Sequence, residues 1–428
     1  MTTAPLPAGL GVRTRLVEEP GRLLDLLPDA QNPLCWLREG EGVVGWGEVA
    51  RFTGVGASRF ADADAWWRRF VAKLDVTDEV GVPGTGPLAF ASFTFADDSP
   101  GSVLVVPRVV VGRRGGVCWI TEFSGDGPSA VWSVSPVQPS GPIRYSDGEM
   151  TVAGYRSAVA EAARRMSRGE LAKAALAHDL LAVAERPLDG RFLLAGLARR
   201  YPTCWSFAVD GLVGATPELL VRRSGGTVSA RVLAGTSWLG EGGAADAEGV
   251  AQQLLASAKD RHEHALAVDS LADSLRPLCA SLEVPEVPSV VELRNVSHLA
   301  TDVRGTLPAE SPASLLLLAE AVHPTAAVGG TPREAAVALI AELESMDRGR
   351  YAGPVGWVDA EGDGELGVAL RCAQLDGRYA RLYAGCGIVA ESDPDTEVRE
   401  AAAKLLAVRE ALEDEPGVDP EDGREDRG

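Results

Sequence analysis

The sequence predicts an α+β fold with a large content of antiparallel sheet. Runs of residues with β-strand patterning follow one another across short glycine-containing turns, a pattern typical of hairpins and meanders. Segments with helical periodicity form separate helices. Strands that pair with their neighbours, together with separate helices, place the chain in the α+β class.

The predicted strands fall into three groups, each expected to form an antiparallel hairpin or meander. The groups are residues 104–111 with 116–123, two runs within 213–236, and three runs within 351–389. The turns between runs lie at residues 112–115, 224–226, 362–364 and 376–377. The predicted helices cover residues 151–168, about 246–276, 314–321, 332–345 and 397–413. In the first helix, Tyr155, Val159 and Met166 share one face, and Gly169 is placed to end it.

Three regions are expected along the chain. Residues 1–150 form an N-terminal β-rich subdomain, and residues 151–412 hold the candidate chemistry. Residues 413–428 carry eight acidic residues and two arginines but few apolar side chains. This tail is therefore expected to be disordered.

The composition of the 428-residue chain excludes several classes of function. With 46% hydrophobic and 24% charged residues, it predicts a globular protein with a large core. The net charge of −20 repels nucleic acid and anionic membranes, so we expect neither as a partner.

We expect a cytoplasmic protein, because no apolar run approaches the ~20 residues of a membrane span and no signal-peptide pattern opens the sequence. The six cysteines lack metal or disulfide spacing and are expected to be reduced.

Lysine is rare in this chain. Only four of the 41 basic residues are lysines, namely Lys73, Lys173, Lys259 and Lys404. Because a lysine can lose its proton and act as a base whereas arginine stays protonated, a lysine in so arginine-rich a chain is a candidate for chemistry. All five histidines lie between Lys173 and Lys404. The chemistry of the protein is therefore expected in this later part.

Two simple motifs do not predict a site. Gly40, Gly42 and Gly45 have the spacing of a dinucleotide-binding loop, but the residues that follow predict a strand where that motif needs a helix N-terminus. His262 and His264 would point about 200° apart on a helix, so they do not face a common metal ion.

Acidic residues lie on the apolar face of the helix predicted at 246–276. Asp260 and His264 share this face with Leu271, and Glu263 lies at its edge. The run of residues 259–264 is also compatible with a solvated charged face. From this segment alone the solvated face is the favoured interpretation.

The last helix repeats the pattern. Glu397, Glu400 and Lys404 share a face with Val408. A surface Glu400–Lys404 pair at i,i+4 is the simple alternative, but it does not explain why the pair occupies the apolar side. Acids misplaced on two helices predict a site for Mg²⁺, which takes oxygen ligands and keeps waters that an anionic substrate can replace.

Six short runs, in order along the chain, resemble those of the chorismate-utilising enzymes, and most closely those of the isochorismate synthases. The runs are residues 215–220 (ATPELL), 233–236 (LAGT), 259–264 (KDRHEH), 297–301 (SHLAT), 323–325 (HPT) and 384–389 (AGCGIV). The resemblance extends over residues 151–412, which it identifies as a chorismate-binding catalytic region. It implies two large antiparallel sheets packed face to face with helices outside.

The resemblance also implies a reaction and two catalytic residues. In this family's isomerase reaction, water is added at ring C2 of chorismate and the C4 hydroxyl leaves, which gives isochorismate. Lys173 matches the general base that activates water, and Glu218 matches the general acid. These roles require a neutral lysine and a protonated glutamate, which burial or neighbouring charges can produce.

The metal and substrate sites follow from the same resemblance. Glu263 and Glu400 match ligands of Mg²⁺, with Asp260 and Glu397 as nearby acids. The ion would connect these acids to the ring carboxylate of chorismate. The residues that match substrate-binding positions are Tyr351, Arg371, Gly385, Gly387 and Lys404 for the enolpyruvyl carboxylate, and Gly235, Thr236 and His298 for the rest of the pocket.

Some positions depart from the family pattern or distinguish its members. His178 stands where an arginine is common, and Ala326 stands where a proline is frequent. Ala234 replaces the lysine of aminodeoxychorismate synthases, and Lys173 replaces the glutamine of anthranilate synthases. Water is therefore the expected nucleophile.

Three functions remain open at this point. The first is a Mg²⁺-dependent isochorismate synthase that acts as a monomer or weak oligomer and supplies menaquinone or siderophore biosynthesis. The second is a salicylate synthase, which forms isochorismate and then eliminates pyruvate. The third is a non-catalytic subunit that binds chorismate or serves a glutamine amidotransferase, against which the intact catalytic and metal residues argue.

Overall fold

The structure, a computed structural model, describes residues 10–30, 32–124, 133–238, 247–292, 296–310 and 312–414. The strands of this part form two large sheets. The first sheet contains β1 (Gly11–Leu16), β2 (Leu34–Arg38), β3 (Glu41–Trp46), β5 (Asp75–Asp78), β8 (Val109–Arg114), β9 (Val117–Phe123), β10 (Ile143–Asp147), β11 (Lys173–Ala184), β12 (Trp205–Val209), β13 (Leu212–Thr216), β19 (Gly330–Thr331), β22 (Cys372–Asp376) and β23 (Tyr379–Ile388). The second contains β4 (Ala50–Gly54), β6 (Leu88–Ser92), β7 (Ser102–Val106), β14 (Leu219–Ser224), β15 (Thr227–Trp238), β16 (Ser281–Glu283), β17 (Ser289–Glu292), β18 (Val296–Thr306), β20 (Pro354–Asp359) and β21 (Gly364–Val368).

Strands from distant parts of the chain alternate within each sheet. The order in the first sheet is β10-β11-β23-β22-β13-β12-β2-β3-β8-β9-β1-β5, with β19 beside β11. The order in the second is β16-β18-β15-β14-β21-β20-β6-β7-β4, with β17 beside β18. β1 and β5 run parallel, whereas the long central pairs β11–β23 and β15–β18 are antiparallel.

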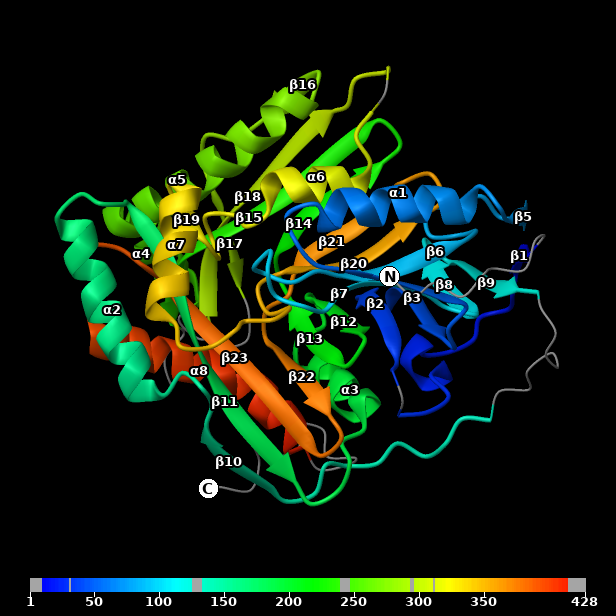
Figure 1. The fold of residues 1–428 in the computed structure, drawn as a ribbon, viewed down its shortest axis with the longest axis horizontal. Helices are drawn as coiled ribbons and strands as arrows, with labels where there is room; N and C mark the ends of the chain where they lie inside the picture. Colours follow the sequence, from blue (N-terminus) through cyan, green and yellow to red (C-terminus); the bar gives the residue numbers. More distant parts are fainter. Residues whose placement is uncertain are drawn as a thin grey trace.

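The two sheets pack face to face where β2 and β12 contact β6 and β20. The helices are α1 (Arg59–Val71), α2 (Val152–Ser167), α3 (Gly190–Arg200), α4 (Ala247–Ala256), α5 (Ala258–Leu275), α6 (Leu315–Val322), α7 (Arg333–Leu343) and α8 (Pro394–Leu412). α2, α3 and α8 cover the outer side of the first sheet, and α1, α5 and α6 cover the second (Figure 1). The predicted fold class, with two packed antiparallel sheets and helices outside, is confirmed.

Three predicted strands are each two strands, because the chain turns a corner from one sheet to the other. Residues 104–111 divide at Pro107 between β7 and β8, and the run that begins at residue 213 divides at Pro217 and Glu218 between β13 and β14. The run after residue 364 divides at 369–371 between β21 and β22. Residues on both sides of each corner are buried, so hydrophobicity does not fall where the strand ends. The pattern of apolar and polar residues along the sequence therefore gave no signal that the strand ends at the corner.

The helices also differ from the prediction in places. The helix predicted at 246–276 is two, α4 and α5, because the Ser257 side chain accepts a hydrogen bond from the backbone N–H of Asp260 (3.2 Å) and caps α5. α2 matches its prediction, with Thr151 as its N-cap. α8 begins three residues earlier than predicted, at Pro394. α1 and α3 were not predicted.

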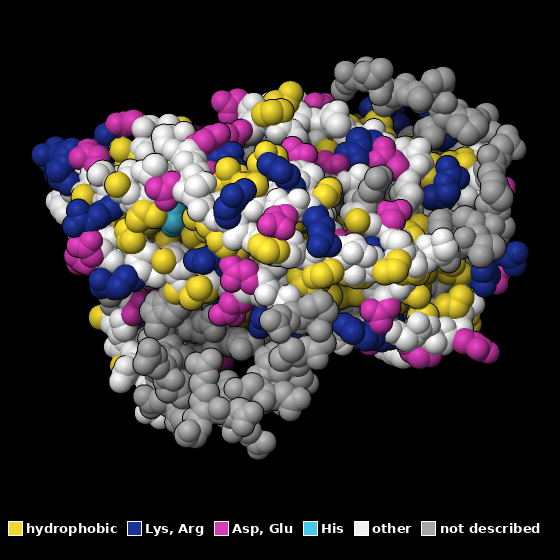
Figure 2. All heavy atoms as spheres, turned by 90° about the horizontal axis from the view of Figure 1, so that it is seen from below, with side chains coloured by type: hydrophobic (Ala, Val, Ile, Leu, Met, Phe, Trp, Pro, Cys, Tyr) yellow, Lys and Arg dark blue, Asp and Glu magenta, His cyan; other side chains and the backbone are white. Residues whose placement is uncertain are grey.

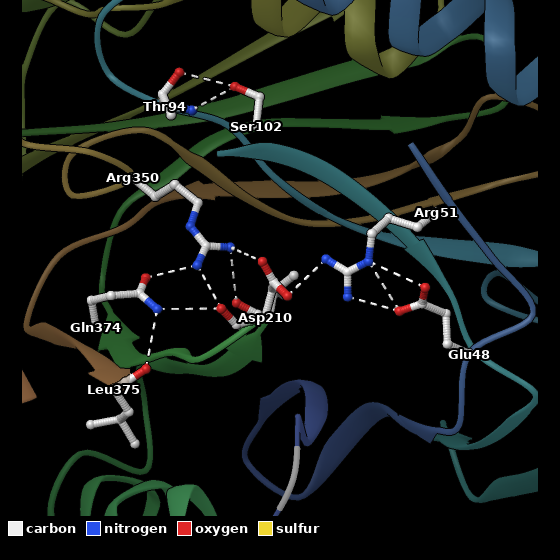
Figure 3. A network of polar contacts seen from close by, with 9 residues as sticks. Glu48, Arg51, Thr94, Ser102, Asp210, Arg350, Gln374 and Leu375 are labelled. Atoms are coloured by element: carbon white, nitrogen blue, oxygen red, sulfur yellow. Dashed lines mark hydrogen bonds and ion pairs between the residues drawn. The ribbon is translucent and has the colours of Figure 1, made fainter. Parts of the chain in front are cut away.

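Strands from residues 1–150 join both sheets, since β2 pairs with β12 and β6 pairs with β20. A polar network reinforces this connection (Figure 3). Arg51 donates to Glu48 and to Asp210 (2.8 Å), and Arg350 donates to Asp210 and to Gln374 (2.7 Å). The division at residue 150 stays a prediction, but it does not separate the sheets.

The surface, the helices, the cysteines and the C-terminal end of the described residues add four findings. On the face shown in Figure 2, acidic and basic side chains are interspersed among the coloured residues. None of the helices in the described part of the chain combines the length and the hydropathy needed to span a bilayer. The six cysteines are free. Of the tail predicted to be disordered, Asp414 pairs with Arg199 and Arg200, and residues 415–428 lie outside the described residues.

Candidate active site

A pocket lies where the two corners at Glu218 and Arg371 meet. The corners are neighbours, because the backbone N–H of Ala215 donates to the carbonyl of Arg371 (3.2 Å) and the N–H of Val368 donates to that of Glu218 (3.1 Å). The predicted site residues that line the pocket are Lys173, Glu218, Gly235, Asp260, Glu263, His298, Tyr351, Arg371, Gly385, Gly387, Glu397, Glu400 and Lys404. Thr236 lies in β15 opposite His298, but its side chain is outside the described residues.

Lys173 is the first residue of β11, and its side chain is only 1% exposed. Its Nζ donates to Glu263 Oε1 at 2.8 Å. Gly387 lies on the adjacent strand β23, where an added Cβ would come within 2.7 Å of Glu263 Oε1 and 2.8 Å of Lys173 Cε. A glycine is therefore required at this position to leave room for the lysine–glutamate pair.

Glu218 is buried at the corner between β13 and β14. Burial raises the pKa of its carboxyl group to about 8, although Lys173 and Arg371 nearby act in the opposite direction. A carboxyl group with this pKa is protonated at neutral pH. It can therefore donate a proton, as a general acid must.

Four acidic side chains enter the pocket from α5 and α8. Asp260 and Glu263 come from the first two turns of α5, while Glu397 and Glu400 come from the start of α8. The interpretation of residues 259–264 as a wholly solvated face is therefore wrong, although His262 is exposed. Glu400 and Lys404 form an ion pair of 2.7 Å in the pocket wall, with side chains 17% and 10% exposed, so this is not a surface pair.

These carboxylates have the chemistry to hold a hard cation such as Mg²⁺, which prefers oxygen ligands. Among the described residues, the ligand atoms of Glu397, Glu400 and Cys386 come within 4.8 Å of one another. Burial raises the pKa of the Cys386 thiol above its ordinary value, so the sulfur stays protonated and is a poor ligand for Mg²⁺. The four carboxylates fit the ion, and the thiol does not contribute.

Basic and polar groups also line the pocket. An Arg371 Nη2 lies 3.5 Å from His298 Nε2. Burial, together with the positive charges of Arg371 and Lys404, lowers the pKa of His298 to about 3, so the imidazole is neutral. Lys404 donates from Nζ to the carbonyl of Gly385 (2.9 Å), and Tyr351 stacks on Tyr383 with ring centroids 5.1 Å apart. The charged donors of Arg371 and Lys404 suit a carboxylate ligand.

One buried ion pair, whose Arg348 lines the pocket, was missed from the sequence. Arg348 pairs with Glu344 (2.6 Å) and donates to the carbonyls of Ala175 (2.6 Å) and Val328 (2.9 Å). Glu344 accepts from the backbone N–H of Ala177 (2.8 Å), so the pair fixes β11 beside the pocket. The i,i+4 spacing at the end of α7 was the only available signal, and it is common in exposed helices.

The two departures from the family pattern do not line the pocket. The His178 ring packs against Tyr155, with centroids 5.0 Å apart, and burial lowers the pKa of its imidazole. Ala326 is fully buried. The next residues, Ala327 and Val328, are part of the pocket lining.

Known proteins resemble the chain over most of its length. The family model described as "Chorismate binding enzyme" matches residues 133–413. "Putative isochorismate synthase MenF" of Mycobacterium tuberculosis is 39% identical over 347 residues, which cover 77% of this chain and 87% of the relative. The solved structure of a putative 2,3-dihydroxybenzoate-specific isochorismate synthase, DhbC from Bacillus anthracis, has a TM-score of 0.75 at 31% identity and covers 91% of this chain and 98% of its own. The menaquinone-specific isochorismate synthase MenF from Escherichia coli has a TM-score of 0.78 at 25% identity, with 96% of each chain covered.

Proposed function

The chain belongs to the family of chorismate binding enzymes, and we propose that within this family it is an isochorismate synthase. In this reaction, water adds at C2 of chorismate and the C4 hydroxyl leaves. The observation that carries the proposal is a buried lysine and a buried, protonated glutamate in one pocket. One group can take a proton and the other can give one.

Lys173 is the proposed general base, which takes a proton from the attacking water. Its Nζ is fixed by Glu263 and is buried against β23, so the amine has a defined position next to the substrate. Glu218 is the proposed general acid, which gives its proton to the departing C4 oxygen. Its raised pKa supports this role, because an ionised carboxylate could not donate.

Mg²⁺ is the proposed cofactor, held by Glu263 and Glu400 with Asp260 and Glu397 nearby. When bound, the ion would neutralise acidic side chains and allow the ring carboxylate of the substrate to enter a pocket that is otherwise rich in negative charge. Without a cation, the four carboxylates would repel that carboxylate.

The enolpyruvyl carboxylate is proposed to bind to the basic groups of the pocket and to the backbone of β23. Arg371 offers a planar pair of donors, Lys404 offers a charged one, and the strand that contains Gly385 and Gly387 offers backbone close to the ligand. An added Cβ at Gly385 would lie 2.4 Å from the carbonyl of Leu176, so the close pairing of β23 with β11 requires a glycine here. Gly235, Thr236 and His298 complete the proposed pocket.

The test is an incubation of the pure chain with chorismate and Mg²⁺, followed by separation of the products. We expect isochorismate with little salicylate, and loss of turnover in excess EDTA. Stoichiometric salicylate and pyruvate would favour a salicylate synthase. No conversion by the chain alone would favour a binding subunit that needs a partner.

A further inference from the structure

A second cavity of about 560 Å³ lies along residues 227–231 of β15, whereas the substrate pocket is lined by residues 233–235 of the same strand. β14 and β18 flank β15 here, with Arg222 opposite Ser229 and Ser229 opposite Arg304 in the strand register. Val228 and Ala230, which also line the cavity, are buried. Arg38, Arg114 and Trp205, from strands of the first sheet, form its wall.

This cavity, which we call the arginine groove, concentrates positive charge in a chain whose net charge is −20. The basic side chains that line it are Arg38, Arg114, Arg222, Arg231 and Arg304, against the acidic Glu283 and Asp302. The inner face of a sheet is ordinarily apolar because the opposite sheet covers it. Here alternate positions of β14, β15 and β18 carry polar side chains. This indicates a groove that is accessible to water and not an empty apolar cavity within the core.

The acids of the groove do not compensate its arginines. Arg114 and Arg222 share a single oxygen of the buried Glu365, each at 3.2 Å. Arg231 is satisfied by Asp302, with bonds of 2.7 and 2.9 Å. The other oxygen of Glu365 accepts from Trp36 Nε1 (2.9 Å), so one carboxylate is shared by two guanidinium groups and an indole.

The other two arginines of the groove lie near acids but form no short ion pair with them. Arg304 stands opposite Glu283 in the register of β18 and β16. Arg304 and Arg38 both act on Asp302, whose pKa they help to lower. The ion pair of Arg38 is with Glu39 at 3.7 Å, and its guanidinium lies 4.4 Å from the ring centroid of Trp205. Within the described residues, the guanidinium of Arg304 makes no hydrogen bond and no ion pair. Guanidinium groups bind carboxylates and phosphates through paired donors, and several around one cavity favour an anion with more than one charge.

We propose that the arginine groove is a binding site for a small oxyanion with two or more negative charges, a polycarboxylate or a phosphate. Hydroxyl groups of Ser229 and Thr306 line the same groove and can donate to such a ligand. The site is distinct from the substrate pocket, because no residue lines both cavities. The proposal does not depend on the proposed function.

The test is calorimetric titration of the full chain with citrate and, separately, with inorganic phosphate, at constant ionic strength set with KCl. We expect saturable binding of at least one anion. Arg304→Glu should raise the Kd by about tenfold or more, because a charge-assisted bond is lost and a repulsive charge is added. Arg69→Glu, which makes the same charge change at an exposed position of α1, should change the Kd less than about twofold.

A further variant separates the two cavities. Arg371→Gln alters the substrate pocket and should leave the affinity for citrate or phosphate unchanged. Binding of citrate alone identifies a polycarboxylate site, and binding of phosphate alone identifies a phosphate site. The proposal is overturned if neither anion binds, if Arg304→Glu binds as the wild type does, or if Arg371→Gln abolishes binding and Arg304→Glu does not.

Discussion

The substrate pocket contains two lysine–glutamate pairs of nearly equal length and different origin. Lys173 Nζ lies 2.8 Å from Glu263, and these residues come from a strand and a helix 90 positions apart. Lys404 Nζ lies 2.7 Å from Glu400, one turn away on the same helix. The first pair exists only because the fold brings β11 and α5 together, whereas the second follows from helical geometry.

The environments of the two lysines also differ. The Lys173 side chain is 1% exposed and forms its ion pair with Glu263. Burial acts to lower the pKa of Lys404, but the charge of Glu400 and its hydrogen bond act in the opposite direction, and the pKa lies above its ordinary value. Lys404 is therefore a permanent cation, suited to hold a carboxylate and unsuited to act as a base. The two lysine–glutamate pairs have similar lengths, but the proposed roles of their lysines differ: Lys173 is the proposed base, and Lys404 is the proposed cation that holds a carboxylate.

The largest expected effect comes from Lys173→Ala. Loss of a general base should lower kcat by about 10² to 10⁴ while chorismate still binds, because no carboxylate contact is removed. Turnover and calorimetric binding of chorismate measure the two effects separately. Lys73→Ala, at an exposed position, is the control and should behave as the wild type. Near wild-type turnover in Lys173→Ala would disprove its role as base.

Glu400→Gln tests the helical pair. The substitution should weaken the binding of Mg²⁺ and the binding of chorismate together, each by about tenfold or more, because a carboxylate ligand is lost and Lys404 loses its partner. Calorimetry with Mg²⁺ alone provides a readout besides activity. Glu286→Gln, at an exposed position, is the matched control. Unchanged Mg²⁺ affinity in Glu400→Gln would remove this residue from the metal site.

We predict that the protonated form of Glu218 is the active one, so the pH profile should show its ionisation. With a pKa of about 8, the acid is intact at pH 7, and kcat/KM should fall by about tenfold per pH unit well above pH 8. The measurement is kcat/KM between pH 6 and 10 on an enzyme shown to stay folded by circular dichroism. A flat profile through this range would contradict the assignment.

The smallest effect is expected from the acidic tail. Removal of residues 415–428 should change the free energy of unfolding by less than about 0.5 kcal/mol and leave kcat unchanged, because this segment has few apolar side chains. Removal of residues 413–428 also deletes Asp414 and its pairs with Arg199 and Arg200, so it should cost up to about 1 kcal/mol. Thermal unfolding compares the two truncations. A large loss of stability in the shorter truncation would show that the tail docks.

Much of the site was predictable because its signals are local. The face that carries Glu397, Glu400 and Lys404 follows from helical periodicity, and the short motifs identified Lys173 and Glu218 as candidates. Gly387 was found from its motif, but the reason for a glycine became clear only from the Lys173–Glu263 pair that it accommodates. The Glu344–Arg348 pair had no motif and was missed.

The sequence by itself determined the helices, the hairpins and the acids on apolar faces, because each depends on residues within a few positions of one another. Only the tertiary structure decided where the chain crosses between sheets, at Glu218 and Arg371, since apolar residues on both sides conceal the corner. It also brought Lys173 to Glu263 and left the arginine groove uncovered. These features depend on the register between strands and helices far apart in the chain, which no local pattern specifies.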